Sequence, residues 1–198
     1  MRKEGFFCGL RAVENKYGPR RKFLIYDVYR AIYKLHKRSM GRKKLAWELG
    51  VGEGSVRTIL NLLLKNSLIL IDKRGVRLTK KGKRVLSRMK RFVRGINTIR
   101  GNELTFNKNA VVGVICKDIG QTFVARDTAV RCGAYGATFI KIGKEPFLSD
   151  IDDETNRRYL KTVENLLSKI EVQEGDTVAL VYADDLKDAE RALWALAV

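Results

Sequence analysis

The sequence is short of several residue types, and each shortage excludes a class of protein. Its 198 residues include three cysteines, widely spaced and without a CxxC pair, which excludes a disulfide framework and a cysteine-based zinc site and indicates reduced, mostly buried thiols. No run of 18 apolar residues occurs, so no membrane-spanning helix is expected. The opening stretch MRKEGFFCGLRAVENKYG is too polar for a secretion signal. We therefore expect a cytoplasmic protein that is not embedded in a membrane.

Signatures of catalysis are also scarce. The single histidine, His36, falls near the end of a predicted helix, and no GxSxG, P-loop, GxGxxG or HExxH motif is found. Carboxylates gather at residues 150–154, but their spacing is not that of an EF-hand loop. They suit the start of a following helix, whose dipole favours negative charge. The sequence thus predicts no catalytic residue, no metal, no cofactor and no enzymatic activity.

Acidic residues are rare in one half of the chain. Residues 1–100 contain 28 Lys+Arg and 6 Asp+Glu, whereas residues 101–198 contain 12 and 16. The net charges are therefore +22 and −4, which give the +18 of the whole chain. Such an excess repels itself unless a polyanion relieves it, so nucleic acid is the expected partner of the first half. An anionic membrane surface is the rival partner, but the amphipathic segments use their apolar faces for a core.

The first half has a regular order of predicted elements. Apolar spacing of three and four predicts helices at residues 23–37, 42–49 and 54–65. Two short β-rich runs, LILI and VRLT, flank the turn signal DKRG and predict a hairpin. Thr79 is placed to cap a last helix, which we expect to run to about Val93. Helix, turn, helix, hairpin and helix form the winged helix-turn-helix pattern.

The third helix has the properties of a DNA-recognition helix. It buries one face and presents a polar edge opposite, where Arg57 suits guanine and Asn61 suits adenine. The start of the helix favours an anion, and Gly54 allows a phosphate close to the backbone there. Cations on the hairpin would reach a neighbouring minor groove or phosphates. The predicted DNA contacts are Arg42, Lys43, Lys44, Gly54, Ser55, Arg57, Thr58, Asn61, Lys65, Lys73, Arg74 and Arg77.

The stretch GRKKLAWELGVGEGSVRTILNLLLKNSLI, followed by GVRLTKKG, resembles the winged-helix domain of bacterial and archaeal transcription regulators. In that domain EGSVRTIL would open the recognition helix. The whole chain also resembles an archaeal family in which such a domain precedes a small α/β domain. The layout of the second half and its stretch RDTAVRCGAYGAT are similar to the GAD domain of some aminoacyl-tRNA synthetases and amidotransferases. The resemblance implies the architecture and leaves the activity open.

Strands alternate with helices in the second half, which is typical of a compact α/β domain. Gly and Asn replace the helical period at residues 95–109, and we expect the domain boundary there. The predicted fold is a two-domain α+β or α/β protein with an N-terminal winged helix-turn-helix and a small C-terminal α/β domain. Its predicted parts are an extension at 1–22, a DNA-binding domain at 23–96, a linker at 97–109 and the α/β domain at 110–198.

Polar residues follow the predicted strands of the second half. If the sheet is open and parallel, its carboxyl edge is where a ligand would bind. The candidate ligand-binding residues are Lys117, Asp118, Arg126, Asp127, Lys141 and Asp184. Ordinary structural roles compete with this interpretation, because Asp184 or Asp185 can cap the final helix and Arg126 with Asp127 can be a simple surface pair.

The function that these features predict is sequence-specific binding of double-stranded DNA by a transcriptional regulator. Its second domain would sense a small effector, support a homodimer, or do both, as in two-fold prokaryotic regulators. One alternative is an RNA-binding protein of the translation apparatus, which the charge and the GAD-like layout favour. The other is an enzyme with an accessory winged helix, with Lys117 and Asp118 as a possible site.

Overall fold

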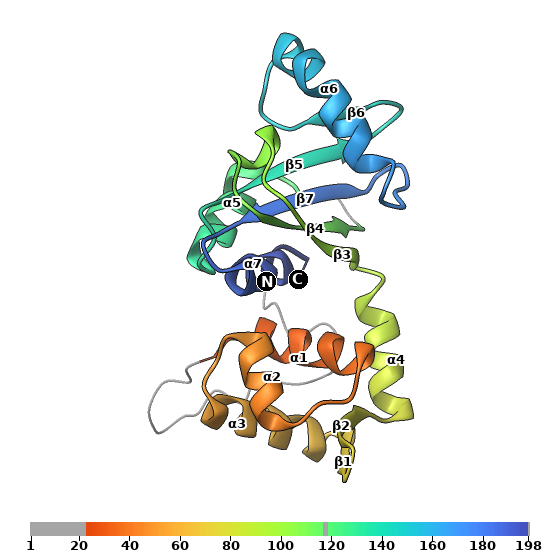
Figure 1. Ribbon diagram of the computed structural model, residues 1–198. Coiled ribbons are helices and arrows are strands. Elements are labelled where there is room, and N and C mark those ends of the chain that lie inside the picture. Colours follow the sequence, from red (N-terminus) through yellow and green to blue (C-terminus); the bar gives the residue numbers. More distant parts are fainter. Residues whose placement is uncertain (1–22, 117–118, 198) are drawn as a thin grey trace. The chain divides into compact units, whose positions relative to one another are not determined.

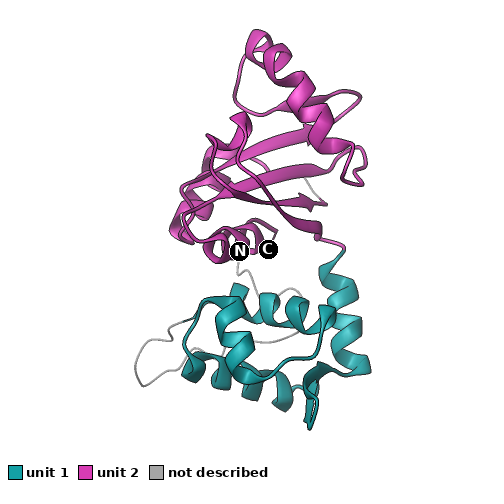
Figure 2. Cartoon of the chain, in the orientation of Figure 1, with its two compact units in different colours: residues 1–90, 198 teal, residues 91–197 magenta. Residues whose placement is uncertain are grey.

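A computed structural model describes residues 23–116 and 119–197 of the chain. The described residues divide into two compact units, 23–90 and 91–197 (Figure 2). The predicted extension at 1–22 lies outside the described residues, as do Cys8, Lys117 and Asp118. None of the helices in the described part of the chain combines the length and apolar character needed to cross a bilayer.

The first unit contains four helices and one hairpin (Figure 1). An isolated bridge between Met40 and Val76 ties the connection after the first helix to the hairpin. Apolar residues at helical spacing, such as Val28, Ile59 and Leu63, are fully buried and form the core. In chain order the elements are α1 (Ile25–Lys37), α2 (Arg42–Leu49), α3 (Glu53–Lys65), β1 (Ile69–Asp72), β2 (Gly75–Leu78) and α4 (Lys80–Met89).

The second unit is a five-stranded sheet covered by helices on both faces. Its elements are β3 (Val93–Ile99), the 3-10 helix η1 (Glu103–Thr105), β4 (Ala110–Ile115), α5 (Thr122–Arg131), β5 (Gly136–Ile142), β6 (Pro146–Leu148), α6 (Asp153–Leu167), β7 (Thr177–Tyr182) and α7 (Leu186–Ala197). The strand order is β3-β4-β7-β5-β6. The chain is therefore a mixed α+β protein with N-terminal helices and a small C-terminal sheet domain.

The two faces of this sheet have different helical covers. Val112 and Val114 of β4 pack with Val163 and Leu166 of α6 in one buried cluster. Gly113 points to the other face, where an added Cβ would lie 2.6 Å from Leu193 of α7. The side chains of a strand alternate between faces, so β4 is buried on both sides and all six of its residues are inaccessible.

Every strand pair in this sheet is antiparallel, and the parallel sheet considered above is wrong. β4 and β5 run in the same direction, but β7 lies between them and runs the opposite way. Along the strand direction, the carboxyl ends of β4 and β5 therefore lie at one end of the sheet. The carboxyl end of β7 lies at the opposite end. The carboxyl ends of these three strands cannot form a single ligand site.

The boundary between the units also differs from the prediction. α4 ends at Met89, before Val93, and the residues expected to be linker continue as β3 and η1. Val93 and Ile96 are buried in the sheet. Gly95, with φ +62°, lies where the β3–β4 register shifts between Arg94 and Asn97, as expected for a β-bulge. Glycine and asparagine mark an irregular strand here, and the units separate after Lys90.

Candidate nucleic-acid interface

The turn between α2 and α3 depends on a glycine. Gly50 adopts a left-handed conformation with φ +66°, and its N–H donates to the carbonyls of Ala46 and Trp47 at the end of α2. This is the usual way in which a helix ends and the chain changes direction. α3 starts three residues later at Glu53, after Gly52 in extended conformation. The short connection fixes α3 against α2.

α3 has one buried face and one exposed polar face. Val56, Ile59, Leu60 and Leu63 are buried, as the spacing predicts. Ser55 is half-buried at the border between the faces. The exposed face includes Gly54, Arg57, Thr58, Asn61 and Lys65, together with the apolar Leu64. The hydroxyl of Thr58 donates to the Gly54 carbonyl at 3.2 Å, which leaves its lone pairs available as acceptors.

Some cations on the exposed face of α3 and in the first turn of α2 form ion pairs with carboxylates, and others do not. Among the described residues Arg57, Lys65 and Lys43 have no ion-pair partner. Arg42 pairs with Glu53 at 3.2 Å. Lys44 lies 3.6 Å from Glu48 and 4.4 Å from the centre of the Trp47 ring. A bound phosphate would compete with a carboxylate at Arg42 and Lys44 but not at Arg57.

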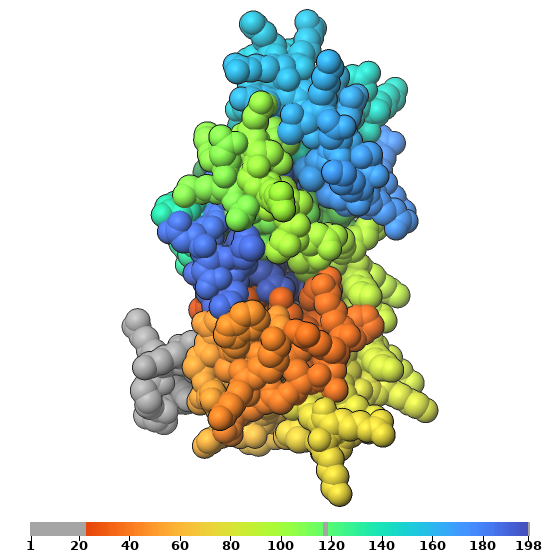
Figure 3. All heavy atoms as spheres, viewed as in Figure 1, coloured from red at the N-terminus to blue at the C-terminus, as the bar shows by residue number. Residues whose placement is uncertain are grey.

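The β1–β2 hairpin presents two further exposed cations at its tip, Lys73 and Arg74. It projects from the surface of the first unit (yellow in Figure 3). Gly75 has φ +106° and lies close to Met40. A Cβ added to Gly75 would lie 3.0 Å from the carbonyl carbon of Met40. Arg77 is held by Asp72 across the hairpin at 2.7 Å. Lys73 and Arg74 are therefore the hairpin cations that can contact an anion without losing an ion pair.

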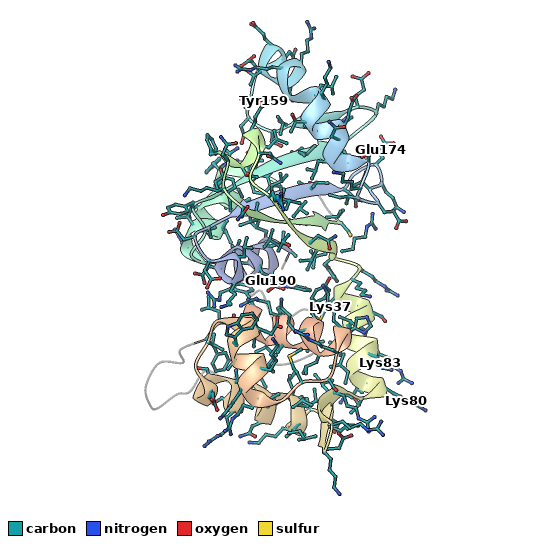
Figure 4. The ribbon with its side chains drawn as sticks, viewed as in Figure 1. Lys37, Lys80, Lys83, Tyr159, Glu174 and Glu190 are labelled. Atoms are coloured by element: carbon teal, nitrogen blue, oxygen red, sulfur yellow. The ribbon has the colours of Figure 1, made fainter. Side chains whose placement is uncertain are left out.

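α4 adds a second cationic face to the unit. Thr79 caps the helix by accepting from Gly82 N–H at 3.0 Å, and its hydroxyl donates to the Ser67 carbonyl. Gly82 is buried against the carbonyl of Leu68. Lys80 and Lys83 point away from the unit (Figure 4). The exposed cations of this segment are Lys80, Lys81, Lys83, Arg84, Arg88 and Lys90. Because the helix ends at Met89, Arg91 and Arg94 do not extend this face.

Each acidic residue described in the first unit already has a cationic partner. Residues 23–90 contain 18 Lys+Arg and 4 Asp+Glu, a net charge of +14. Asp27 is buried against Arg30 at 2.8 Å, and Glu53 and Asp72 pair as described above. Burial works to raise the pKa of Glu48, but a hydrogen bond from Arg38 and the charges of Lys34 and Lys44 hold it below its ordinary value. The remaining positive charge of the unit is therefore uncompensated.

A depression of about 300 Å³ lies between the end of α1, β2 and α4. Its lining includes His36, Arg38, Arg77 and Lys83. The side chain of His36 is exposed, but partial desolvation of its ring lowers its pKa, and repulsion from Lys90, Lys83 and Lys37 lowers it further. This is the electrostatic environment that a phosphate group would relieve. The sequence did not bring His36, Arg38 and Lys83 together, because residues from three elements meet there without any shared motif.

In the second unit, the predicted ligand-binding residues do not come together. Arg126 pairs with Asp150 at 3.0 Å, whereas Asp127 pairs with Arg131 at 2.9 Å. The expected Arg126–Asp127 pair is therefore wrong. Arg126 also donates to the carbonyl of Ala137 at the start of β5, and Lys141 lies near the end of the same strand. Positions 117 and 118 lie outside the described residues, and the described members of the set have separate partners.

Asp184 has a local structural role. It accepts a hydrogen bond from the Tyr135 hydroxyl at 2.7 Å and lies 3.9 Å from Lys108. The ammonium group of Lys108 in turn lies 4.1 Å from the centre of the Tyr135 ring. The neighbouring Asp185 accepts from the backbone of Lys187 and caps α7, as the sequence predicts for one of these two residues. Asp152 caps α6 by accepting from Thr155, which accounts for part of the acidic stretch.

Comparison with known proteins divides the chain in the same way. Residues 25–84 match the family described as PH0730-like, N-terminal domain. Residues 105–198 match the family described as Domain of unknown function (DUF4443). No curated protein matches the chain in sequence.

Several chains of solved structures match this chain, and one of them is similar over most of its length. The hypothetical protein PH0730 from Pyrococcus horikoshii OT3 has a TM-score of 0.71 and 23% sequence identity, covering 89% of this chain and 91% of that chain. The PH0730-like match falls within the first unit, and the DUF4443 match falls within the second apart from residue 198. The strand β3 lies between the two matched ranges.

Proposed function

We propose that the first unit is a winged helix-turn-helix domain that binds double-stranded DNA. Its order of helix, bridge, helix, helix, hairpin and helix supports this. In such domains the third helix enters the major groove and the hairpin contacts the backbone or the next minor groove. α3 would be the recognition helix, and the β1–β2 hairpin would be the wing.

The observation that carries this proposal is the exposed polar edge of α3 on a cationic unit. Arg57 and Asn61 lie four residues apart on one face of the helix, so both can address the same groove. They are exposed, while the opposite face of the helix is buried in its own unit. The phosphate contacts would come from cations without carboxylate partners, such as Lys43, Lys65 and Lys73, and these contacts position the protein without reading sequence.

The complete chain would act as a transcriptional regulator. The second unit would bind an effector, hold two chains together, or do both. A two-fold dimer would place two copies of α3 at half-sites one helical turn apart, about 34–36 Å. The GAD-like resemblance remains a prediction about the layout of the second unit. Binding of structured RNA is the alternative function, so the affinity for duplex DNA must be compared with the affinity for a structured RNA.

The proposal is tested by selecting bound fragments from sheared genomic DNA with the full chain and sequencing them. We expect a shared sequence motif that is lost with Arg57→Ala. Arg157→Ala is the matched control, because Arg157 is an exposed cation of α6 in the second unit. Fragments without any common sequence, or tighter binding to a structured RNA at the same salt concentration, would contradict the assignment.

A further inference from the structure

A cavity of about 390 Å³ lies within the second unit, on the face of the sheet that α6 covers. This volume is in the range of small-molecule sites. Its walls are largely apolar and come from the 3-10 helix η1, the start of β5, the segment between β6 and α6, and the first turns of α6. Leu104, Leu148, Tyr159 and Tyr182 are among its lining residues; Tyr159 is labelled in Figure 4.

One buried hydroxyl in this wall has no partner. Ser149 is 6% exposed and lines the cavity, and among the described residues its Oγ makes no hydrogen bond. Leaving a buried hydroxyl unsatisfied is unfavourable. By contrast, the hydroxyl of Thr138, a partly buried residue of the wall, donates to the Leu104 carbonyl at 2.6 Å. Ser149 Oγ is therefore an unsatisfied hydroxyl at the wall, and rotation of this short side chain can turn it toward a molecule in the cavity.

The charges around the cavity are already balanced or exposed. Arg126, the cation of the lining, pairs with Asp150 at 3.0 Å and donates to the Ala137 carbonyl at 3.1 Å. The hydroxyl of Thr122 also donates to Asp150. Glu103 lies exposed at the mouth, where water screens its charge. A charged ligand would lose its hydration inside the cavity without a free counter-charge, which is costly.

We propose that this cavity binds a small, uncharged and largely apolar molecule, with one hydrogen-bonding group placed against Ser149 Oγ. The site deepens the effector role proposed above for the second unit and rests on that role. The rim agrees with an apolar ligand, because Phe106 is 74% exposed and contacts the Tyr182 ring with centroids 5.8 Å apart. Phe106 and Asp150 both have positive φ values, 50° and 64°, so the backbone on two sides of the mouth is held in a conformation that non-glycine residues seldom adopt.

The test titrates the full chain, without DNA, with three ligands that share one aromatic skeleton. These are 1-naphthylacetamide, 1-naphthylacetate and 2-(1-naphthyl)ethylamine, which are neutral, anionic and cationic at pH 7. Binding is followed by calorimetry and by the NMR signals of the Leu104 and Leu148 methyl groups. We expect the amide to bind at least about tenfold more tightly than either charged compound. Equal or tighter binding of a charged compound, or no change in these methyl signals with the amide, would overturn the proposal.

A variant of the serine separates its role from general packing. Ser149→Ala removes no hydrogen bond of the described structure, so the fold should be retained. We expect it to weaken binding of the amide by about three- to tenfold and to leave binding of 1-ethylnaphthalene, which lacks the polar group, unchanged. Ser168→Ala, at an exposed serine after α6, is the control and should affect neither ligand. If Ser149→Ala affects both ligands equally, or neither, the proposed contact is wrong. Because no DNA is present, failure here is distinguishable from failure of DNA binding.

Discussion

Arg57 and Lys73 are both exposed cations of the first unit, but they should contribute to DNA binding in different ways. Arg57 projects from the middle of α3 and can donate two hydrogen bonds to guanine. We expect Arg57→Ala to reduce the preference for the cognate site by about 1–3 kcal/mol. Lys73 lies at the hairpin tip, where it would contact phosphate. Lys73→Ala should weaken binding to all duplexes alike and lower the salt slope by about 1.

Fluorescence anisotropy with a selected duplex and a permuted duplex, at several salt concentrations, measures both effects. Arg157→Ala removes the same charge as Arg57→Ala from the other unit and should change neither quantity. An equal loss on both duplexes for Arg57→Ala and Lys73→Ala would show that α3 does not read the bases.

Two glycines of the first unit should respond oppositely to alanine. No atom lies within 4 Å of the position of a Cβ at Gly54, so alanine fits and favours the helix. We expect Gly54→Ala to raise the free energy of unfolding by about 0.4–1 kcal/mol while weakening DNA binding at the start of α3. A Cβ at Gly82 would lie 2.1 Å from the Leu68 carbonyl oxygen, so Gly82→Ala should lower the free energy of unfolding by about 1–3 kcal/mol.

Urea denaturation of the two variants measures the free energies, and anisotropy measures the binding. A Gly54→Ala protein that is more stable and binds DNA as tightly as the parent would exclude a close phosphate at the start of α3. A Gly82→Ala protein of unchanged stability would show that the contact with Leu68 relaxes easily.

Single residues were predictable where a side chain has one dominant preference. The buried and exposed faces of α3 follow from helical spacing, and Thr79 caps α4 as its position before a cationic helix predicts. The buried ion pair of Arg30 with Asp27 was not predictable, because arginine is normally exposed. Arg30 also donates to the Leu49 carbonyl at 2.9 Å, a partner 19 residues away that local sequence does not reveal.

Among the elements, the helices of the first unit were predicted well and the sheet of the second unit was not. Strands buried on both faces, such as β4, carry no alternation that indicates the direction of their neighbours. Their antiparallel pairing with β7 therefore could not be read from the sequence. The bulge at Gly95 was interpreted as a linker because glycine and asparagine are common to both structures. The antiparallel pairing explains why the carboxyl ends of the three strands do not form one site.

The junction of α1, β2 and α4 makes a prediction about pH. The pKa of His36 is lowered by partial desolvation of its exposed ring and then by repulsion from Lys90, Lys83 and Lys37. In the unfolded chain this pKa returns to about 6.5. The folded protein therefore binds this proton less readily than the unfolded chain, so stability should fall as pH drops from about 6.5 through the folded pKa. His36→Gln should remove this part of the pH dependence.

Because His36 is the single histidine of the chain, an NMR titration of its ring protons reports this pKa directly. We expect a value below 6.5 in the free protein that rises with added salt and with bound duplex DNA, since both relieve the repulsion. An ordinary pKa in the free protein would contradict the electrostatic description. A value that rises with salt and not with DNA would show that phosphates do not approach this end of the unit.

At the scale of the whole molecule, the division of charge between the units is the feature that the sequence revealed most directly. The excess of cations is confined to the unit that carries the exposed edge of α3, while the second unit carries a cavity with balanced charges. The proposed DNA-binding unit and the proposed ligand-binding unit would together supply the parts that a regulated transcription factor requires. Coupling between them would appear as a change in DNA affinity when the cavity is filled, and linkage requires the reciprocal effect on the ligand.

The affinity of the full chain for a duplex recovered by genomic selection, relative to a permuted duplex of the same length in 150 mM salt, tests sequence-specific DNA binding most directly. We predict a ratio of about 10³ or more in favour of the selected duplex, as specific DNA-binding proteins show. Equal affinity for the two duplexes, or tighter binding to a structured RNA of the same length, would contradict the proposed function.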